Sequence, residues 1–243
     1  MARKTLLITG ASSGIGAATA LLAAPDHDLA LHYGSNRAGA EEVADAARAH
    51  GARVTIHAAD LSDPASIAPL FAEFDAEHDA LHGLVNNAGI VDMAARIADF
   101  TPDRVARMVA VNLTAPILIA GQAARRMTRG AAIVNVTSAA VKYGSPGEYA
   151  DYAATKGGLE VFTKGLAMEL VADGIRVNAV RPGIIDTDIH AKGGQPGRVA
   201  RVAPNVPMAR AGTADEVAHA ILWLLSDAAS YTTDTILDVS GGR

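Results

Sequence analysis

The sequence has no cysteine among its 243 residues. Without cysteine a chain can form no disulfide framework, perform no thiol chemistry and bind no zinc through thiolates. Its 8 histidines are scattered and form neither an HExxH motif nor a close pair, so we expect no metal site. The absence of cysteine also fits a reducing compartment, and we expect a cytoplasmic protein.

The chain also lacks an apolar run long enough to cross a membrane. Residues 113–124 are interrupted by Pro116 and Gln122, and the apolar run near the start stops at Gly10, too early for the core of a signal peptide. The formal net charge is −5, which argues against a nucleic-acid partner. We therefore expect a soluble protein that binds neither nucleic acid nor membrane.

Hydrophobic residues make up 50% of the chain, which is ample for a sizeable core. Short apolar runs with strand character alternate with segments in which apolar residues recur at helical spacing. This alternation predicts an α/β fold, a Rossmann-like, doubly wound sheet of seven parallel strands with helices on both faces. No repeat or linker interrupts the pattern, so we expect a single domain over residues 1–243. The predicted strands are residues 5–9, 29–33, 54–58, 81–86, 132–136, 175–180 and 235–239.

Several helix starts carry capping signals. Ser145 and Glu148 have the spacing of a capping box just before Tyr152. We expect Glu148 to bond back to the Ser145 amide, which keeps its carboxylate away from Tyr152. The other predicted caps are Asp63 before Pro64, Thr101 before Pro102, and the box of Thr213 with Glu216.

A glycine-rich turn follows the first predicted strand and leads directly into an alanine-rich helical segment. Its glycines are spaced GxxxGxG and permit a tight turn with close backbone approach to a ligand. The next helix would direct free N–H groups and its positive dipole end at a pyrophosphate. A plain flexible turn is the alternative, but the position between first strand and first helix favours a dinucleotide site. We expect its contacts to be Gly10, Ser12, Ser13, Gly14, Ile15 and Gly16.

The end of the second predicted strand, His32-Tyr33-Gly34-Ser35-Asn36-Arg37, carries no carboxylate. A carboxylate there would accept bonds from the ribose 2′-hydroxyl of NAD and repel the 2′-phosphate of NADP. Ser35, Asn36 and Arg37 can instead hold a phosphate, Arg37 through a charge-assisted bond. We therefore expect NADP(H) to be favoured over NAD. The alternative is that Arg37 is a solvated residue opening the next helix.

Tyr152 and Lys156 stand four residues apart at the head of a segment with helical periodicity. On a helix this spacing places both side chains on one face, so the ammonium can lie near the phenol. A positive charge about 4 Å away favours the phenolate by roughly 4 kcal/mol at an effective dielectric near 20, before desolvation opposes it. We expect this to lower the pKa of Tyr152 from about 10 toward neutrality. The alternative is chance spacing of a packed tyrosine and a solvated lysine.

Four motifs occur in order along the chain: residues 9–16, Asn86-Asn87-Ala88-Gly89, Ser138, and the Tyr152/Lys156 pair. In this combination they resemble the short-chain dehydrogenase/reductase family, and the resemblance extends over residues 5–242. It implies hydride transfer between a nicotinamide cofactor and a small carbonyl or alcohol substrate, with the protein supplying position and a proton.

The resemblance implies roles for the matching residues. Asn112, Ser138, Tyr152 and Lys156 would form a catalytic tetrad, with Tyr152 as general acid or base. The Asp60 side chain would lie at the adenine ring, and residues 182–187 resemble the segment that holds the nicotinamide carboxamide and diphosphate. The cofactor contacts that it implies are Asp60, Leu61, Asn87, Ala88, Gly89, Tyr152, Lys156, Pro182, Gly183, Ile185 and Thr187.

Ser138 and Asn112 also have a physical rationale. Ser138 follows an apolar strand at the carboxyl edge, where its hydroxyl could hold a substrate oxygen near Tyr152; a plain strand end is the alternative. Asn112 stands four residues before Pro116, which has no N–H, so the Asn112 carbonyl would lose its helical donor. A water bound to that carbonyl beside the lysine would serve a proton relay; an ordinary proline kink is the alternative.

The segment between Ser138 and Tyr152 is one residue longer than is common in the family, and we place the insertion in residues 144–148. Tyr149 is a second candidate for the general acid. It has no lysine four residues later, so we assign it to the pocket wall.

Residues 184–212 are rich in glycine and proline, and we expect an irregular lid over the substrate. His190, Gln195 and Arg198 are its polar candidates for substrate contact; solvated side chains are the alternative. Residues 145–152 and this lid together resemble sugar- or polyol-active members and acyl-carrier-reductase-like members of the family, and they do not single out one of these groups. No basic cluster near the lid points to an acidic carrier protein.

Our leading hypothesis is therefore an NADP-dependent carbonyl reductase or alcohol dehydrogenase. A non-catalytic dinucleotide-binding sensor or regulator is the alternative, which the intact tetrad disfavours. Apolar faces in residues 105–127 and 159–171, with the last predicted strand, would suit a homotetramer or homodimer. A monomer that buries the same helices internally is the alternative.

Overall fold

Seven strands form one parallel sheet, in the order β3-β2-β1-β4-β5-β6-β7, in the computed structural model, which describes residues 3–243. Most of their side chains are buried, because helices cover both faces, and each strand therefore reads as an apolar run. Every predicted strand is present, with ends that differ from the prediction by up to two residues. The strands are β1 (Lys4–Ile8), β2 (His27–Tyr33), β3 (Val54–Ala58), β4 (Gly83–Asn86), β5 (Ala132–Val136), β6 (Arg176–Pro182) and β7 (Ile236–Val239).

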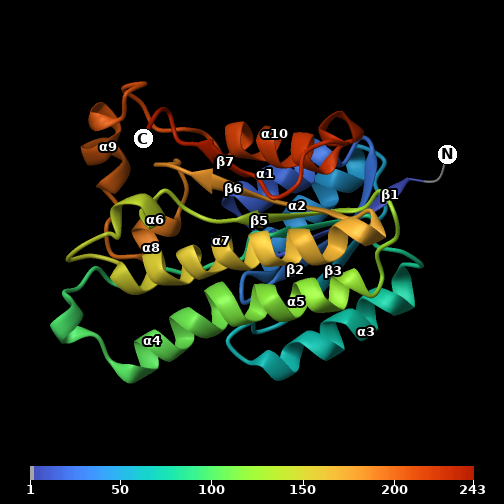
Figure 1. Cartoon of the computed structure of the whole chain (residues 1–243), viewed down its shortest axis with the longest axis horizontal. Coiled ribbons are helices and arrows are strands. Elements are labelled where there is room, and N and C mark those ends of the chain that lie inside the picture. Colours follow the sequence, from blue (N-terminus) through green and yellow to red (C-terminus); the bar gives the residue numbers. More distant parts are fainter. Residues whose placement is uncertain (1–2) are drawn as a thin grey trace.

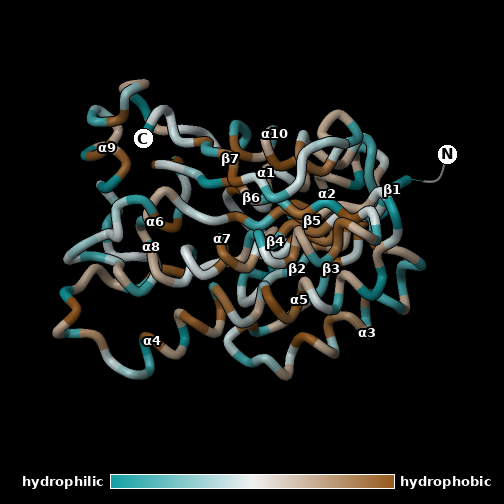
Figure 2. Tube along the Cα trace, viewed as in Figure 1, coloured by the Kyte–Doolittle hydropathy of each residue, from teal (hydrophilic) through white to brown (hydrophobic). Residues whose placement is uncertain are grey.

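The helices lie in two layers, so the predicted doubly wound α/β fold is confirmed (Figure 1). One hydrophobic core lies between the sheet and α3, α5 and α7, and the other between the sheet and α1, α2 and α10. In Figure 2 the hydrophobic residues gather along the central strands between these layers. The bounds are α1 (Gly14–Ala23), α2 (Arg37–Ala49), α3 (Ile67–Glu77), α5 (Ala115–Ala124), α7 (Ala150–Leu170) and α10 (Ala214–Leu225).

A π-helical turn, η3 (Ala110–Thr114), joins α4 (Pro102–Val109) to α5. The amide of Ala115 bonds to the carbonyl of Ala110, five residues earlier, because Pro116 has no N–H with which to continue an α-helical ladder. The interruption predicted from Pro116 is thus confirmed, but it takes the form of a π turn instead of a simple kink.

Together these segments make a helical stretch, Pro102–Ala124, of 23 residues that could cross a membrane by length and composition alone. The expectation that no segment reaches this length was therefore wrong. The core helix of a folded domain passes the same test, and Ile119, Ala120 and Ala123 are buried against the sheet. Of the window that passes the test 39% is buried inside the protein, while Val105, Val109 and Leu118 on the same stretch are exposed.

Three predicted caps are confirmed. Asp63 accepts from the Ala65 amide at 2.9 Å and Thr101 from the Arg104 amide at 3.2 Å. Thr213 and Glu216 form both bonds of the capping box at the start of α10. These signals lie within four residues of one another, which is why the sequence reveals them.

The capping box predicted for Ser145 and Glu148 is wrong. Ser145 has a left-handed backbone with φ of 45°, and α7 begins only at Ala150, after Tyr149 at the N-cap. The Glu148 carboxylate instead pairs with Arg198 at 2.6 Å. A contact across 50 residues thus replaces the local one.

Residues 184–212 were predicted to be irregular but contain short helices. Ile185 bridges Gly212, which brings the two ends of the segment together. The helices in it are α8 (Ile189–Lys192), α9 (Arg198–Val202) and the 3-10 turn η5 (Ala203–Asn205). The remaining short elements are η1 (Pro64–Ser66), η2 (Ile97–Asp99), α6 (Ala140–Tyr143), η4 (Val171–Asp173) and η6 (Asp227–Ala229).

Candidate functional site

The strand order reverses between β1 and β4, which are neighbours although β2 and β3 lie between them in sequence. Open parallel sheets bind ligands outside the carboxyl ends of their strands at such a switch point. A cavity of about 540 Å³ lies at this edge. Among the predicted site residues, those that line it are Gly10, Ser12, Ser13, Gly14, Ile15, Ser35, Asn36, Asp60, Leu61, Asn87, Ala88, Gly89, Ser138, Tyr152, Lys156, Pro182, Gly183, Ile185 and Thr187.

The glycine turn has the shape and polarity that a dinucleotide pyrophosphate requires. Gly10 and Gly14 have φ of 66° and 56°, a left-handed conformation that glycine adopts without strain. A Cβ on Gly10 would lie 2.9 Å from the Cα of Ala88. Ser13 is the N-cap of α1, and within the described chain its side chain makes no capping bond. The first N–H groups of α1 are therefore available to an anion, and the residues present fit the cofactor.

Gly16 does not line the cavity but lies behind the turn. A Cβ there would clash with the Gly10 carbonyl and would lie 2.6 Å from Nδ2 of Asn87. That Nδ2 donates to the carbonyls of Thr9 at 2.8 Å and Gly10 at 3.1 Å. Gly16 thus lets α1 pack closely against the turn, while Asn87 ties the turn to β4.

His32, which the sequence did not reveal as a site residue, holds the same turn from β2. The Gly10 amide donates to its Nδ1 at 3.2 Å, and its Nε2 lies 3.0 Å from the Ala59 carbonyl. The side chain is buried, and burial lowers its pKa below the ordinary value. His32 is therefore a neutral imidazole with its proton on Nε2. Only the sheet order, which places the end of β2 beside β1, brings it to the turn.

Ser35 and Asn36 line the cavity and Arg37 does not, and the contact of Arg37 with a phosphate stays a prediction. Its Nε donates to Oε1 of Glu41 at 2.7 Å, and its side chain is 70% exposed. In this arrangement Arg37 is the solvated helix residue of the alternative interpretation. Asn36 caps α2 by accepting from the Gly39 amide at 3.2 Å.

Asp60 lies in the cavity wall, and its contact with the adenine ring stays a prediction. Its Oδ1 accepts from the amide of Ser62 at 2.9 Å and from the Ser62 hydroxyl at 2.7 Å. These bonds lower the pKa of the Asp60 carboxyl, so it is ionised near neutral pH.

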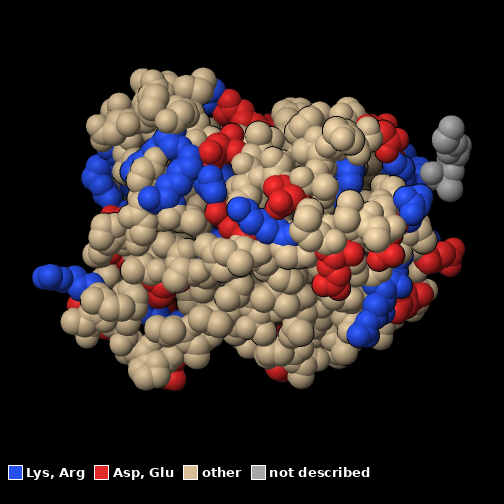
Figure 3. Space-filling model, viewed as in Figure 1, with Lys and Arg blue, Asp and Glu red and all other residues tan. Residues whose placement is uncertain are grey.

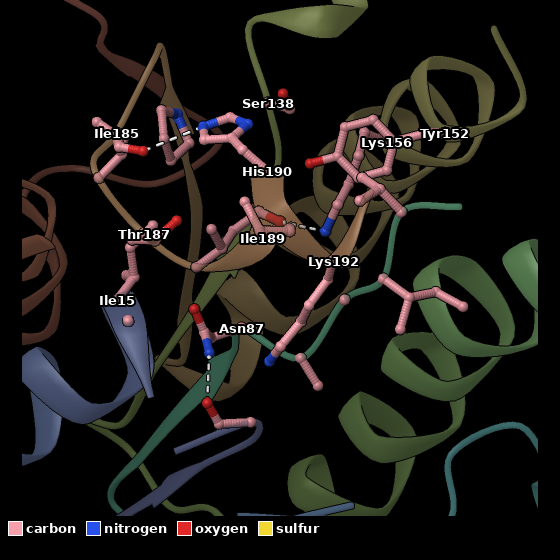
Figure 4. Close-up of a pocket in the computed structure, with 18 of the residues that line it drawn as sticks. Ile15, Asn87, Ser138, Tyr152, Lys156, Ile185, Thr187, Ile189, His190 and Lys192 are labelled. Carbon is pink, nitrogen blue, oxygen red and sulfur yellow. Dashed lines mark hydrogen bonds between the residues drawn. The ribbon is translucent and has the colours of Figure 1, made fainter. Parts of the chain in front are cut away.

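Tyr152 and Lys156 lie one turn apart on α7, and both side chains reach into the cavity (Figure 4). Lys156 Nζ is 5.9 Å from the centroid of the Tyr152 ring and donates to the carbonyl of Val136 at 2.8 Å. Burial lowers the pKa of Lys156 to about 8.

The pKa of Tyr152 is raised by burial, and the Ser138 hydroxyl opposes the shift only in part. The predicted lowering by Lys156 is therefore wrong for the chain without its cofactor. The cause is desolvation of the phenolate, which the sequence argument left out of its magnitude. Ser138 follows β5 at the carboxyl edge as expected, and its Oγ accepts from the Ala140 amide at 3.1 Å.

Asn112 is fully buried in the π turn η3 and does not line the cavity. Its Oδ1 accepts from the Ile90 amide at 2.8 Å, and its Nδ2 donates to the Ile90 carbonyl at 2.9 Å. A Cβ on Gly89 would lie 3.3 Å from both Asn112 Oδ1 and Lys156 Nζ. The side chain of Asn112 therefore fixes the segment after β4 against the lysine.

Tyr149 lines the cavity, as its assignment to the pocket wall predicted, and binds residues 184–212. Its hydroxyl donates to the Gly193 carbonyl at 3.0 Å and accepts from Nε2 of Gln195 at 2.9 Å. His190 also lines the cavity and turns to the Ile185 carbonyl, 3.1 Å from Nε2 (Figure 4). Of the three polar candidates, His190 and Arg198 face the cavity and Gln195 does not.

Basic side chains gather at the end of the molecule that holds α9 and the C-terminus (Figure 3). Several are neutralised locally: Arg198 pairs with Glu148, Arg210 with Glu216 and Lys142 with Asp238. In the part of the chain that the structure describes, no group of three or more His, Asp or Glu side chains could hold a metal ion.

The chain is similar to known proteins along almost its whole length. The family described as "Enoyl-(Acyl carrier protein) reductase" matches residues 10–243. The chain is 46% identical to "Uncharacterized oxidoreductase YgfF" of Escherichia coli (strain K12), over 98% of both chains. It is 39% identical to "Cis-4-hydroxycyclohexanecarboxylate dehydrogenase" of Sinomonas cyclohexanicum, over 99% of this chain and 96% of that one.

A similar solved structure is that of a short chain dehydrogenase from Burkholderia cenocepacia J2315 in complex with NADP. The TM-score is 0.90 at 34% identity, and the match covers 98% of this chain and 97% of the other. The fold therefore has a counterpart in a related protein whose structure contains NADP.

Proposed function

Because the chain belongs to the short-chain dehydrogenase/reductase family and is an NAD(P)-dependent oxidoreductase, we propose that it interconverts a carbonyl and an alcohol. The observation that carries this proposal is one cavity with the glycine turn at one end and Ser138, Tyr152 and Lys156 at the other. A non-catalytic sensor would need only the nucleotide end, and no observation favours it.

Nicotinamide cofactor, when bound, supplies or accepts the hydride. Tyr152 would donate its proton to the carbonyl oxygen during reduction and take it back during oxidation. Ser138 would hold that oxygen by a hydrogen bond near the phenol. Lys156, with a pKa of about 8, would exchange protons near neutral pH beside the phenol. Asn112 would keep the segment after β4 in place beside the lysine.

The substrate would be a small carbonyl or alcohol compound enclosed by residues 184–212 as a lid. Two comparisons bear on its class: a relative named for the dehydrogenation of a ring alcohol with a carboxylate, and a family described as enoyl-(acyl carrier protein) reductase. A panel of aldehydes, open-chain and cyclic ketones, sugars and acyl thioesters, followed by NADPH absorbance, would test the proposal. We expect oxidation of NADPH with one carbonyl class; protein that binds NADPH yet oxidises it with no member would contradict it.

We infer that the cofactor is NADP(H), because the cavity beside Ser35 and Asn36 holds no carboxylate at the end of β2 and because related structures contain NADP. Ser35→Asp would place a negative charge beside the 2′-phosphate. We expect its Kd for NADPH, measured by fluorescence titration, to rise at least about tenfold while that for NADH changes little. Arg37→Ala is the matched variant outside the cavity, and we expect a smaller effect from it. Equal loss of NADPH and NADH affinity in Ser35→Asp would contradict the assignment.

We further propose a cytoplasmic homotetramer, or a homodimer. Large apolar side chains are exposed along α4, α5 and α7, and Val161 and Met168 on α7 are 72% and 58% exposed in the single chain. Surfaces of this kind are characteristic of subunit interfaces.

A further inference from the structure

A buried ion pair joins α4 to the start of α7. Nε of Arg104 lies 2.7 Å from Oδ2 of Asp151, and its Nη2 donates to Oδ1 at 3.2 Å. The two side chains are only 9% and 5% exposed. Burying two charges is costly unless both stay paired, so removal of either partner leaves the other unpaired in a dry environment.

Asp151 directly precedes Tyr152 in the chain. Its Oδ1 also accepts from the Tyr152 amide at 2.9 Å, one of the N–H groups that the first turn of a helix leaves without a partner. The carboxylate therefore connects the Arg104 guanidinium to the backbone of Tyr152. This contact fixes the first turn of α7, from which the phenol projects into the cavity.

Arg104 also contacts the segment that follows β4. Its Nη1 donates to the Met93 carbonyl at 2.5 Å, and its guanidinium stacks on the Phe100 ring, 4.1 Å from the centroid. Met93 lies two residues after Val91, which lines the cavity, and the Ala95 amide donates to the Glu148 carbonyl at 3.1 Å. One side chain thus joins the segment after β4 to the start of α7.

We propose that Arg104 and Asp151 are positioning residues for the reaction. Neither lines the cavity, so neither touches a bound substrate. Together they set the direction of the Tyr152 phenol and the distance between it and the Val91 wall. This inference depends on the proposed role of Tyr152, because what the pair positions is the proton donor.

The chain contains a matched control for this pair. Arg126 and Asp75 form the same bidentate contact, with both distances 2.6 Å, and Arg126 also stacks on a phenylalanine, Phe71, at 4.6 Å. This pair joins α3 to the end of α5, away from the cavity. Its side chains are 21% and 48% exposed, so it reports what a more exposed Arg–Asp–Phe arrangement contributes to folding without any role at Tyr152.

The test uses Arg104→Met, Arg104→Lys and Asp151→Asn beside Arg126→Met and Asp75→Asn. For each variant kcat, KM and the pH profile of kcat/KM are measured, and kcat is expressed per NADPH-binding site. We expect kcat per site in the Arg104→Met and Asp151→Asn variants to fall by about 10²-fold, with NADPH affinity unchanged, since misplacement by about 1 Å can cost this much. The apparent pKa of the limb of the pH profile that reports Tyr152 should also shift. Arg104→Lys should recover part of kcat, and the control variants should keep it.

A role in folding alone would give a different result, because fewer NADPH sites would form while kcat per site and the pH profile stayed as in the wild type. That result, or an equal loss in Arg126→Met, would overturn the inference. If Arg104→Met does not fold, the kcat values and pH profiles of Arg104→Lys and Asp151→Asn test the inference, since both new residues are close to the original ones in size. If the wild type transfers no hydride, the proposed function fails and this inference with it; active wild type with unchanged variants removes the inference alone.

Discussion

Among single residues, His32 links pH to the stability of the nucleotide end. It must be neutral to accept from the Gly10 amide, and burial lowers its pKa below the ordinary 6.5. Because the unfolded chain then binds more protons than the fold at acidic pH, the contribution of His32 is complete above about 6.5. It is lost progressively as the pH falls below that value toward the folded pKa.

We expect His32→Asn to reduce this pH dependence. The Asn amide oxygen can take the place of Nδ1 as acceptor, yet the side chain does not titrate. Urea unfolding of both proteins across the acidic range would measure the slope of the unfolding free energy against pH. His27, His78, His82 and His190 also have lowered pKa values, so the slope should shrink and not vanish. Identical slopes in the two proteins would contradict the role given to His32.

Between strand and helix, the β1–α1 turn depends on close packing at Gly16. A methyl group there would displace the Gly10 carbonyl and the Asn87 amide together. We expect Gly16→Ala to raise the Kd for NADPH at least about tenfold, measured by fluorescence titration. Gly165→Ala is the matched control on α7, where a Cβ meets no atom within 4 Å among the described residues. It should leave binding unchanged and stabilise the helix by about 0.5–1 kcal/mol. Equal affinity in both variants would show that the close approach is not needed.

The elements themselves were largely predictable because their signals are local. Apolar runs located every strand, and caps such as Asp63 and Thr101 act within three residues. The glycine turn and the i, i+4 spacing of Tyr152 and Lys156 are local as well. For this reason most of the predicted site residues line one cavity.

What the sequence could not supply are contacts between distant segments and the extent of burial. Arg104 meets Asp151 across 47 residues, and Arg198 replaces the predicted local partner of Glu148 across 50. The extent of burial is also why the direction of the Tyr152 pKa shift was predicted wrongly. Desolvation depends on how many neighbours enclose the phenol, and spacing alone does not reveal that.

For the whole molecule, the apolar surface of α4, α5 and α7 predicts association. We expect light scattering with size-exclusion chromatography to give a tetramer, and Val161→Glu to lower the mass, because a buried carboxylate at an interface is costly. Ile97→Glu is the control, since Ile97 is 74% exposed but lies in η2. A wild-type monomer, or a mass that Val161→Glu leaves unchanged, would contradict the proposed assembly.

The proposed activity of the whole enzyme depends on proton delivery by the Tyr152 phenol inside the cavity that would hold the cofactor. The most direct test is a single-turnover measurement with Tyr152→Phe, saturated with NADPH and mixed with a carbonyl substrate found for the wild type. We predict that NADPH still binds while its oxidation slows by about 10²- to 10⁴-fold, the usual contribution of a general acid. Oxidation at the wild-type rate would show that another group supplies the proton.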